Sequence, residues 1–286
     1  MPDNVILGDM YTALMFIATK SFSEKQENKI KGRIDEELGK SIQFVGRCFG
    51  KYDIIVEFRE ESSAKIASYK ACKMQEEASK MMWEKMPKDY QIKDSICSSL
   101  VLCREFIKTD GMKKSSIKGL PIKFYSLFVP KNTPINLDQI LEEVKDNMGL
   151  FFSSSYFAFL LVISGNNFYD VFDDFSKFRE SSKEFFLESS TYVAIDWEKE
   201  DIPSDKKKIE ANVLLKLEDG FGNIEDIVRD DFIKSEYKRF GSFDFSLLVA
   251  EGTLSEMKKK ILKLRENRKI SHTSTSLLIE GRGING

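Results

Sequence analysis

Hydrophobic and polar positions follow the same order three times along the chain. In each copy a strand-like alternation is followed by apolar residues at helical spacing, two more extended segments, a second helical stretch and a closing strand. The last copy is the clearest, with predicted extended segments at 208–217, 237–250 and 270–280. Its second helix begins at a capping box, because Thr253 is followed three residues later by Glu256.

The first and middle copies repeat this order. Small polar residues that can cap a helix N-terminus precede the expected helices, at Ser23, Ser62, Asn136 and Asn167, and at Asn223 in the last copy. The helix after Asn136 is expected to carry apolar residues as far as 148. The predicted extended segments cover 11–19, 42–58 and 95–106 in the first copy, and 122–129, 150–164 and 185–197 in the middle copy.

The order strand-helix-strand-strand-helix-strand is the split βαβ, or ferredoxin-like, arrangement. It makes a four-stranded antiparallel sheet with two helices on one face. We therefore expect an α+β protein of three βαββαβ modules, covering residues 1–108, 119–200 and 206–286. Polar, turn-rich segments near 108–119 and 198–207 are the expected linkers.

The face of each sheet that carries no helix needs cover from another layer. Both alternations of the first strand are apolar over 13–18. Two modules can pair sheet to sheet within the chain, which leaves the third with an open apolar face. Such a face is unusual on a monomer. We therefore expect a homo-oligomer, most simply a dimer closed by a two-fold axis.

Composition narrows the classes of partner. The 286 residues carry a net charge of -2, which argues against general binding to nucleic acid. A structural metal site is not expected, because the one histidine is His272 and the cysteines form no C-x-x-C pair. Scattered cysteines, with no signal-like or membrane-length apolar run, favour the cytoplasm without membrane contact. The cysteines are Cys48, Cys72, Cys97 and Cys103.

A turn motif recurs between the central strands. It reads Gly-x-aromatic-Asp and is followed by an apolar strand, at 50–53 in the first copy and at 241–244 in the last. This pattern resembles the effector-binding domain of the Lrp/AsnC family of transcription regulators, and the Thr/Ser-rich strand at 273–278 is similar to that domain's closing strand. The middle copy departs from the pattern, with Ser154 and Phe157 where Gly and Asp are wanted.

The resemblance implies modules that pair sheet to sheet, as in dimeric α+β barrels, and that bind a small effector such as an amino acid near this turn. Glycine lets the backbone approach a ligand, and the aspartate can accept from an ammonium group. A purely structural role for the same residues, making and capping the turn, stays open. The ligand-binding positions it implies are Gly50, Tyr52, Asp53, Gly241, Phe243 and Asp244.

A complete regulator of that family also carries a helix-turn-helix module. The first strand begins near Tyr11, which leaves no room for one, and the Lys258–Lys260 run is expected to be a solvated helix face rather than a recognition surface. We therefore expect no direct DNA binding.

No catalytic set stands out, since a nucleophile-histidine arrangement could use only His272. The sequence favours a small-molecule sensing or scaffolding protein without a cofactor, rather than an enzyme. The alternative is an enzyme or haem-binding protein that uses a cavity between paired α+β sheets, with His272 as the candidate ligand or base.

Overall fold

The computed structural model describes residues 5–19, 31–32, 34–36, 38–50, 52–60, 96–108, 119–131, 135–153, 158–203, 208–217, 233–239, 242–267 and 269–278. The chain is an α+β protein in which strands predominate. Its strands are β1 (Val5–Thr19), β2 (Ile42–Phe49), β3 (Ile54–Glu60), β4 (Ile96–Lys108), β5 (Ile122–Pro130), β6 (Met148–Ser153), β7 (Phe159–Gly165), β8 (Phe186–Asp196), β9 (Ile209–Leu217), β10 (Ile233–Lys238), β11 (Phe245–Glu251) and β12 (Ile270–Leu278). The helices are η1 (Gly39–Ser41), α3 (Leu137–Glu142), α4 (Phe168–Ser181) and α5 (Leu254–Arg265).

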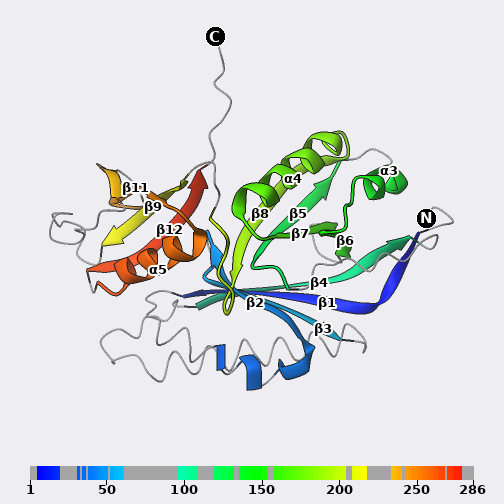
Figure 1. The fold of residues 1–286 in the computed structure, drawn as a ribbon, viewed down its shortest axis with the longest axis horizontal. Helices are drawn as coiled ribbons and strands as arrows, with labels where there is room; N and C mark the ends of the chain where they lie inside the picture. Colours follow the sequence, from blue (N-terminus) through cyan, green and yellow to red (C-terminus); the bar gives the residue numbers. More distant parts are fainter. Residues whose placement is uncertain are drawn as a thin grey trace, which may run out of the picture.

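Strands β1 to β8 close into one barrel, in the order β1-β3-β2-β8-β5-β7-β6-β4, and strands β9 to β12 form a separate sheet in the order β10-β11-β9-β12. Figure 1 shows this second sheet, with α5 against it, beside the barrel. All paired strands run antiparallel. The expected boundaries of the three modules stay a prediction.

The barrel has one half formed by β1 to β4 and another formed by β5 to β8, and two seams join them. Strand β2 pairs with β8, and β4 pairs with β6 through Cys103 and Ser153. The first seam depends on Gly46, because a Cβ atom there would lie 2.6 Å from the carbonyl oxygen of Ile195. A closed barrel leaves no unpaired strand edge, so the seams remove a site of nonspecific association.

Alternate residues of the barrel strands face inward and outward. In β1, Met15 packs outward against Ile34 and Leu38, while Leu14 and Phe16 face the interior. Because both faces are covered by apolar groups, both alternations of β1 are apolar, as the sequence pattern indicated.

Helix α4 covers the outer face of β5 and β7 (Figure 1). It begins where the sequence predicts, because the Asn167 side chain accepts a hydrogen bond from the Asp170 amide at 2.9 Å. Its buried stripe is Phe168, Val171, Phe175 and Phe178. Helix α5 likewise begins at Thr253, whose hydroxyl accepts from the Glu256 amide at 3.1 Å.

The helix expected to run from Asn136 to Met148 is shorter than predicted. Helix α3 ends at Glu142, and Met148 begins β6. Pairing of β6 with both β4 and β7 overrides the helical spacing, because those strand pairs close the barrel. The helices expected after Ser62 and Asn223 lie outside the described residues, as does most of the one after Ser23.

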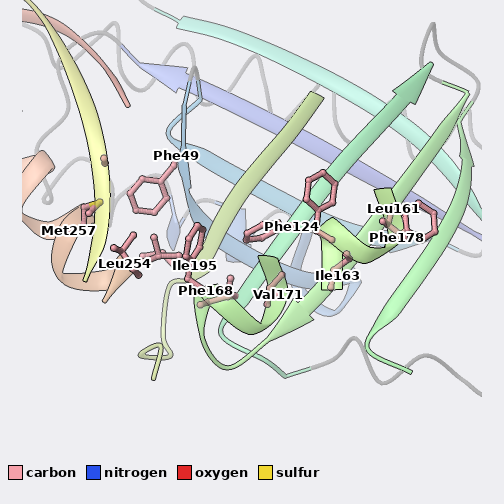
Figure 2. Packing of buried hydrophobic residues seen from close by; sticks show 14 of the residues in the cluster. Phe49, Phe124, Leu161, Ile163, Phe168, Val171, Phe178, Ile195, Leu254 and Met257 are labelled. Carbon is pink, nitrogen blue, oxygen red and sulfur yellow. The ribbon is translucent and has the colours of Figure 1, made fainter. Parts of the chain in front are cut away.

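Helix α5 lies between its own sheet and the barrel. Figure 2 shows Phe49, at the end of β2, between Leu254 and Met257 of α5 and the residues beside α4. The prediction that Lys258 lies on a solvated face is wrong. Lys258 is buried and donates from Nζ to the Cys48 carbonyl at 2.7 Å, because this side of α5 docks on the barrel.

Candidate functional site

The barrel interior is packed with apolar and aromatic side chains, with Phe44, Tyr125 and Phe151 among them. Three aromatic rings pack against one another toward one end of the interior. The Phe16 ring centroid lies 5.2 Å from that of Tyr52 and 4.8 Å from that of Tyr192, and the two tyrosine rings are 5.6 Å apart. Contacts of this kind are typical of a packed core.

A buried ionic group lies among these apolar residues. Lys123 Nζ of β5 donates to Glu57 Oε2 of β3 at 2.7 Å, and the Tyr125 hydroxyl lies 3.0 Å from the same oxygen. The side chains of Glu57 and Lys123 are each only 3% exposed. The two strands belong to opposite halves of the barrel, so only barrel closure brings these three residues together.

The surroundings control the protonation of this group. Burial by itself would raise the pKa of Glu57, but the charge and hydrogen bond of Lys123 reverse the effect, and the pKa lies below its usual value. Burial, together with the nearby Glu57 carboxylate, holds the pKa of Tyr125 well above its usual range. At neutral pH the group therefore contains an ionised carboxylate and a neutral phenol.

The charged side chains continue along the interior toward the other end of the barrel. The Lys123 ammonium lies 4.7 Å from the Phe44 ring centroid, an additional stabilising contact for a buried cation. Two residues beyond Glu57 on the same face of β3, Arg59 Nη2 lies 3.8 Å from Glu105 Oε2 of β4. Opposite charges thus alternate along the interior: Lys123, Glu57, Arg59 and Glu105.

The expected ligand-binding turn at 50–53 lies beside the three packed rings, to which Tyr52 belongs. Gly50 has a φ of 110°, a conformation that favours glycine, and Tyr52 is buried in the ring cluster. The buried Asp53 carboxylate accepts hydrogen bonds from the two terminal nitrogens of Arg265, Nη1 and Nη2, and Lys258 Nζ lies 3.8 Å away. Both cations come from α5.

The turn before β11, which carries Asp244, shares a backbone contact with the turn at 50–53. The Asp53 amide donates to Ile17 O, and the Asp244 amide donates to Leu215 O. The side chains differ, since Asp244 Oδ2 accepts from the Leu217 amide at 2.8 Å. Phe243 is half-buried, and Gly241 lies outside the described residues.

The two turns belong to different sheets, and the structure does not join them into one site. Their carboxylates contact protein groups, as the structural interpretation of the motif expects. The assignment of a ligand to these six positions stays a prediction.

Sequence reasoning missed Glu57, Lys123 and Tyr125. The available signal was a charged residue inside an otherwise apolar strand, Glu57 in IIVEF and Lys123 in IKFYS. Each lies on the face of its strand that was expected to pack against another module. The two strands do not pair with each other, and only closure of the barrel brings the two charges together, so the local sequence pattern gives no signal for the pair.

Among the described residues, those of the barrel interior do not fit a haem. His272 belongs to β12 of the separate sheet and not to a barrel strand. The interior offers the thiols of Cys48 and Cys103 and the Tyr125 phenol. Burial raises the pKa of each thiol to about 12, and Tyr125 is hydrogen-bonded to Glu57. Protonated thiols are poor metal ligands.

Comparisons with known proteins give little beyond the fold. No family model matches the sequence, and no curated protein matches it. Among solved structures, one described as a candidate chlorite dismutase matches with a TM-score of 0.46 and 10% sequence identity, over 65% of this chain and 94% of that one. A likeness at this level does not transfer an activity.

The same comparison corrects one expectation. The sequence favoured a sensing or scaffolding protein of the Lrp/AsnC type, whereas the matching solved structure is described as an enzyme. The sensing and scaffolding interpretation is therefore withdrawn. Within the described part of the chain, no helix is both long enough and apolar enough to cross a membrane.

Proposed function

We propose that the barrel consists of two ferredoxin-like βαββαβ modules paired sheet to sheet, the arrangement of dimeric α+β barrels within a single chain. The support is the strand order. The first half reads β4-β1-β3-β2, the second reads β8-β5-β7-β6, and the separate sheet repeats it as β12-β9-β11-β10. In each case the order is fourth, first, third and second strand of the module, as the split βαβ requires.

We also propose that the chain is an enzyme that works by acid–base and electrostatic catalysis inside this barrel. The observation that supports it is the buried Glu57 carboxylate, which Lys123 and Tyr125 both contact. Removing an ion pair from water is costly, and well-packed apolar residues of similar volume often give equal or greater stability. An ionic group in an otherwise apolar core is therefore a candidate for function.

The three side chains have complementary abilities. The Lys123 ammonium has three N–H donors, and hydrogen bonds to Glu57 and a bound oxygen can be made together. Tyr125 can donate its proton, and Glu57 can hold a proton at Oε2. In a site from which water is excluded, such donors stabilise negative charge that develops on a substrate oxygen. The reaction class that suits this arrangement is proton transfer on a small oxygen-containing molecule.

Hydrogen exchange into small organic acids in D₂O, followed by proton NMR, tests this proposal. The wild-type protein is expected to speed loss of the signal from carbon-bound protons next to the carbonyl of at least one acid in the panel. Glu57→Gln and Tyr125→Phe should each slow that exchange by about 100-fold, the lower range for a positioned acid or base. Glu142→Gln, on the surface of α3, is the matched control.

Two results would go against the enzyme proposal. The first is a wild-type protein that speeds exchange in none of the acids. The second is a folded Glu57→Gln variant, with the circular dichroism of the wild type, that retains the wild-type rate.

A further inference from the structure

Arg59 is the member of the interior charge row whose hydrogen-bonding capacity is least used. Its side chain faces inward, because it shares one face of β3 with Ile55 and Glu57. A guanidinium has five N–H donors. The ion pair to Glu105 Oε2, at 3.8 Å, is longer than a hydrogen bond, and Nε is buried without a hydrogen-bond partner among the described residues. Buried donors without a partner are uncommon and call for an explanation.

The exposed fraction of the side chains increases along this row of interior charges. The side chains of Glu57 and Lys123 are 3% exposed, whereas those of Arg59 and Glu105 are 21% and 24% exposed. The rings of Phe16, Tyr52 and Tyr192 pack against one another toward the opposite end of the interior. The less buried side chains along this row are therefore those of Arg59 and Glu105, on the side from which we infer that a small molecule approaches Glu57.

We propose that Arg59 binds the acid group of the barrel's ligand, and that this ligand is a small carboxylate or other oxyanion. The planar fork of a guanidinium matches the two oxygens of such a group. Residues two apart on one strand face are separated by about 7 Å, so a bound acid at Arg59 has its neighbouring atoms near Glu57 and Tyr125. The inference rests on the proposed function and names the class of substrate.

Glu105 has a definite part in this arrangement. Its carboxylate lies where it competes with an incoming anion for the Arg59 guanidinium. Removing its charge should tighten anion binding if Arg59 holds a ligand. If Arg59 serves only as the structural partner of Glu105, the same change should leave anion binding unaltered.

Calorimetric titration of the full chain with pyruvate and with inorganic phosphate, at constant ionic strength, tests the proposal. We expect binding of at least one anion by the wild type, weakening by about tenfold or more in Arg59→Met, and an intermediate effect in Arg59→Lys, which keeps the charge but loses the fork. Glu105→Gln should bind more tightly than the wild type. Arg104→Met is the matched control. Arg104 is next to Glu105 on β4, and its guanidinium lies over the Tyr11 ring.

Failure of this inference and failure of the proposed function give different results. Equal anion affinity in the wild type, Arg59→Met and Glu105→Gln overturns the role of Arg59, whatever the exchange assay shows. No binding of either anion by the wild type also overturns it. Glu57→Gln should still bind the anion while losing hydrogen exchange, and anion binding without exchange in the wild type would sink only the enzyme proposal. The melting transition of Arg59→Lys should match that of the wild type, which would show that weaker binding in this variant does not come from loss of folding.

Discussion

Three buried carboxylates in the described part of the chain are held by groups from distant segments. Asp53 is held by Arg265, Glu57 by Lys123, and Asp201 by the backbone amides at the start of α5. A buried carboxylate that loses its partner keeps the cost of burial without the compensating attraction. Substitution of one partner should therefore be far more damaging than loss of a surface ion pair, which contributes little.

Glu57 should make stability depend on acid pH. Its folded-state pKa is lowered, so the stabilisation is present above the unfolded value, about pH 4.3, and is lost as pH falls toward the folded pKa. Urea unfolding at pH 5, 4 and 3 should show this loss in the wild type and a shallower loss in Glu57→Gln. At pH 7 that variant should be less stable by about 3 kcal/mol, because Lys123 is left unpaired. If the free energy of unfolding fell equally with pH in the two proteins, the lowered pKa assigned to Glu57 would be contradicted.

Asp53 and Arg265 should behave as a coupled pair. Asp53→Leu and Arg265→Met should each lower the free energy of unfolding by about 3–5 kcal/mol, because each leaves a buried opposite charge. The double variant should lose less than the sum of the two, as measured by a double-mutant cycle in urea without any added ligand. Additive losses would show that the two side chains act independently, and would leave the Asp53 carboxylate open to another role.

Among the described elements, α5 contacts both the separate sheet and the barrel. Its N-terminus is capped twice, by Thr253 and by Asp201, which precedes it by some fifty residues in the chain. The Asp201 oxygens accept from the Leu254 amide at 2.7 Å and the Ser255 amide at 3.1 Å. The segment expected to be a polar linker is therefore docked at this residue, and it fixes the start of α5.

Asp201→Ala should loosen this attachment. The substitution leaves two amides of the first turn of α5 without an acceptor and removes a negative charge from the helix N-terminus, at a cost of about 2 kcal/mol. Proteolysis under native conditions should cut the variant faster between the barrel and β9 than it cuts the wild type. Asp173→Ala, an exposed position on α4, is the control and should change nothing. An unchanged rate in Asp201→Ala would show that the cap does not hold the segment.

The barrel seam gives a second prediction for an element. Gly46→Ala should destabilise the chain by about 1–3 kcal/mol, because its new methyl group would lie 2.6 Å from the Ile195 carbonyl oxygen across the β2–β8 seam. Gly32→Ala, in a helical segment where a Cβ meets nothing within 4 Å, should instead stabilise by roughly 0.5–1 kcal/mol. Thermal melting measures both. If the two substitutions changed the stability equally, the proposed crowding at Gly46 would be contradicted.

At the scale of the whole molecule, the second face of the separate sheet is only partly covered by the described residues. Helix α5 packs on one face, through Val213 and Leu247, while the described residues of the other face include half-buried Leu214 and Leu248. On that face Tyr237 is 60% exposed and Leu278 37% exposed. The barrel halves cover the corresponding faces by closing on each other, whereas this sheet has no such partner among the described strands.

We predict that a second copy of the chain supplies this cover. Light scattering at micromolar concentration should give about twice the 32.9 kDa of one chain. Leu248→Lys should shift the mass toward the monomer by placing a charge on the shared face, while Glu236→Lys, on the neighbouring strand, should leave it unchanged. A mass near 32.9 kDa for the wild type would sink the dimer and favour cover from within the chain.

Most strand positions and most of the described helices could be predicted from the sequence, although β1 and β10 begin before the extended segments predicted at 11–19 and 237–250. Alternation marked β5 and β9, and a small polar cap marked the first residues of α4 and α5. These signals are local, because side-chain direction alternates along a strand and a cap contacts amides only two or three residues away. The helix after Asn136 was predicted too long because strand pairing, which is not local, decided where it ended.

The candidate site could not be predicted in the same way. Glu57 and Lys123 are 66 residues apart and meet only because β3 and β5 lie in opposite halves of one barrel. Asp53 and Arg265 are separated by 212 residues. The sequence by itself determined the order of elements and which strand faces are apolar, since both follow from local geometry. Only the tertiary structure decided which charges are buried and paired, because the energy of a buried charge depends on the partner that the closed barrel and the docked helix place beside it.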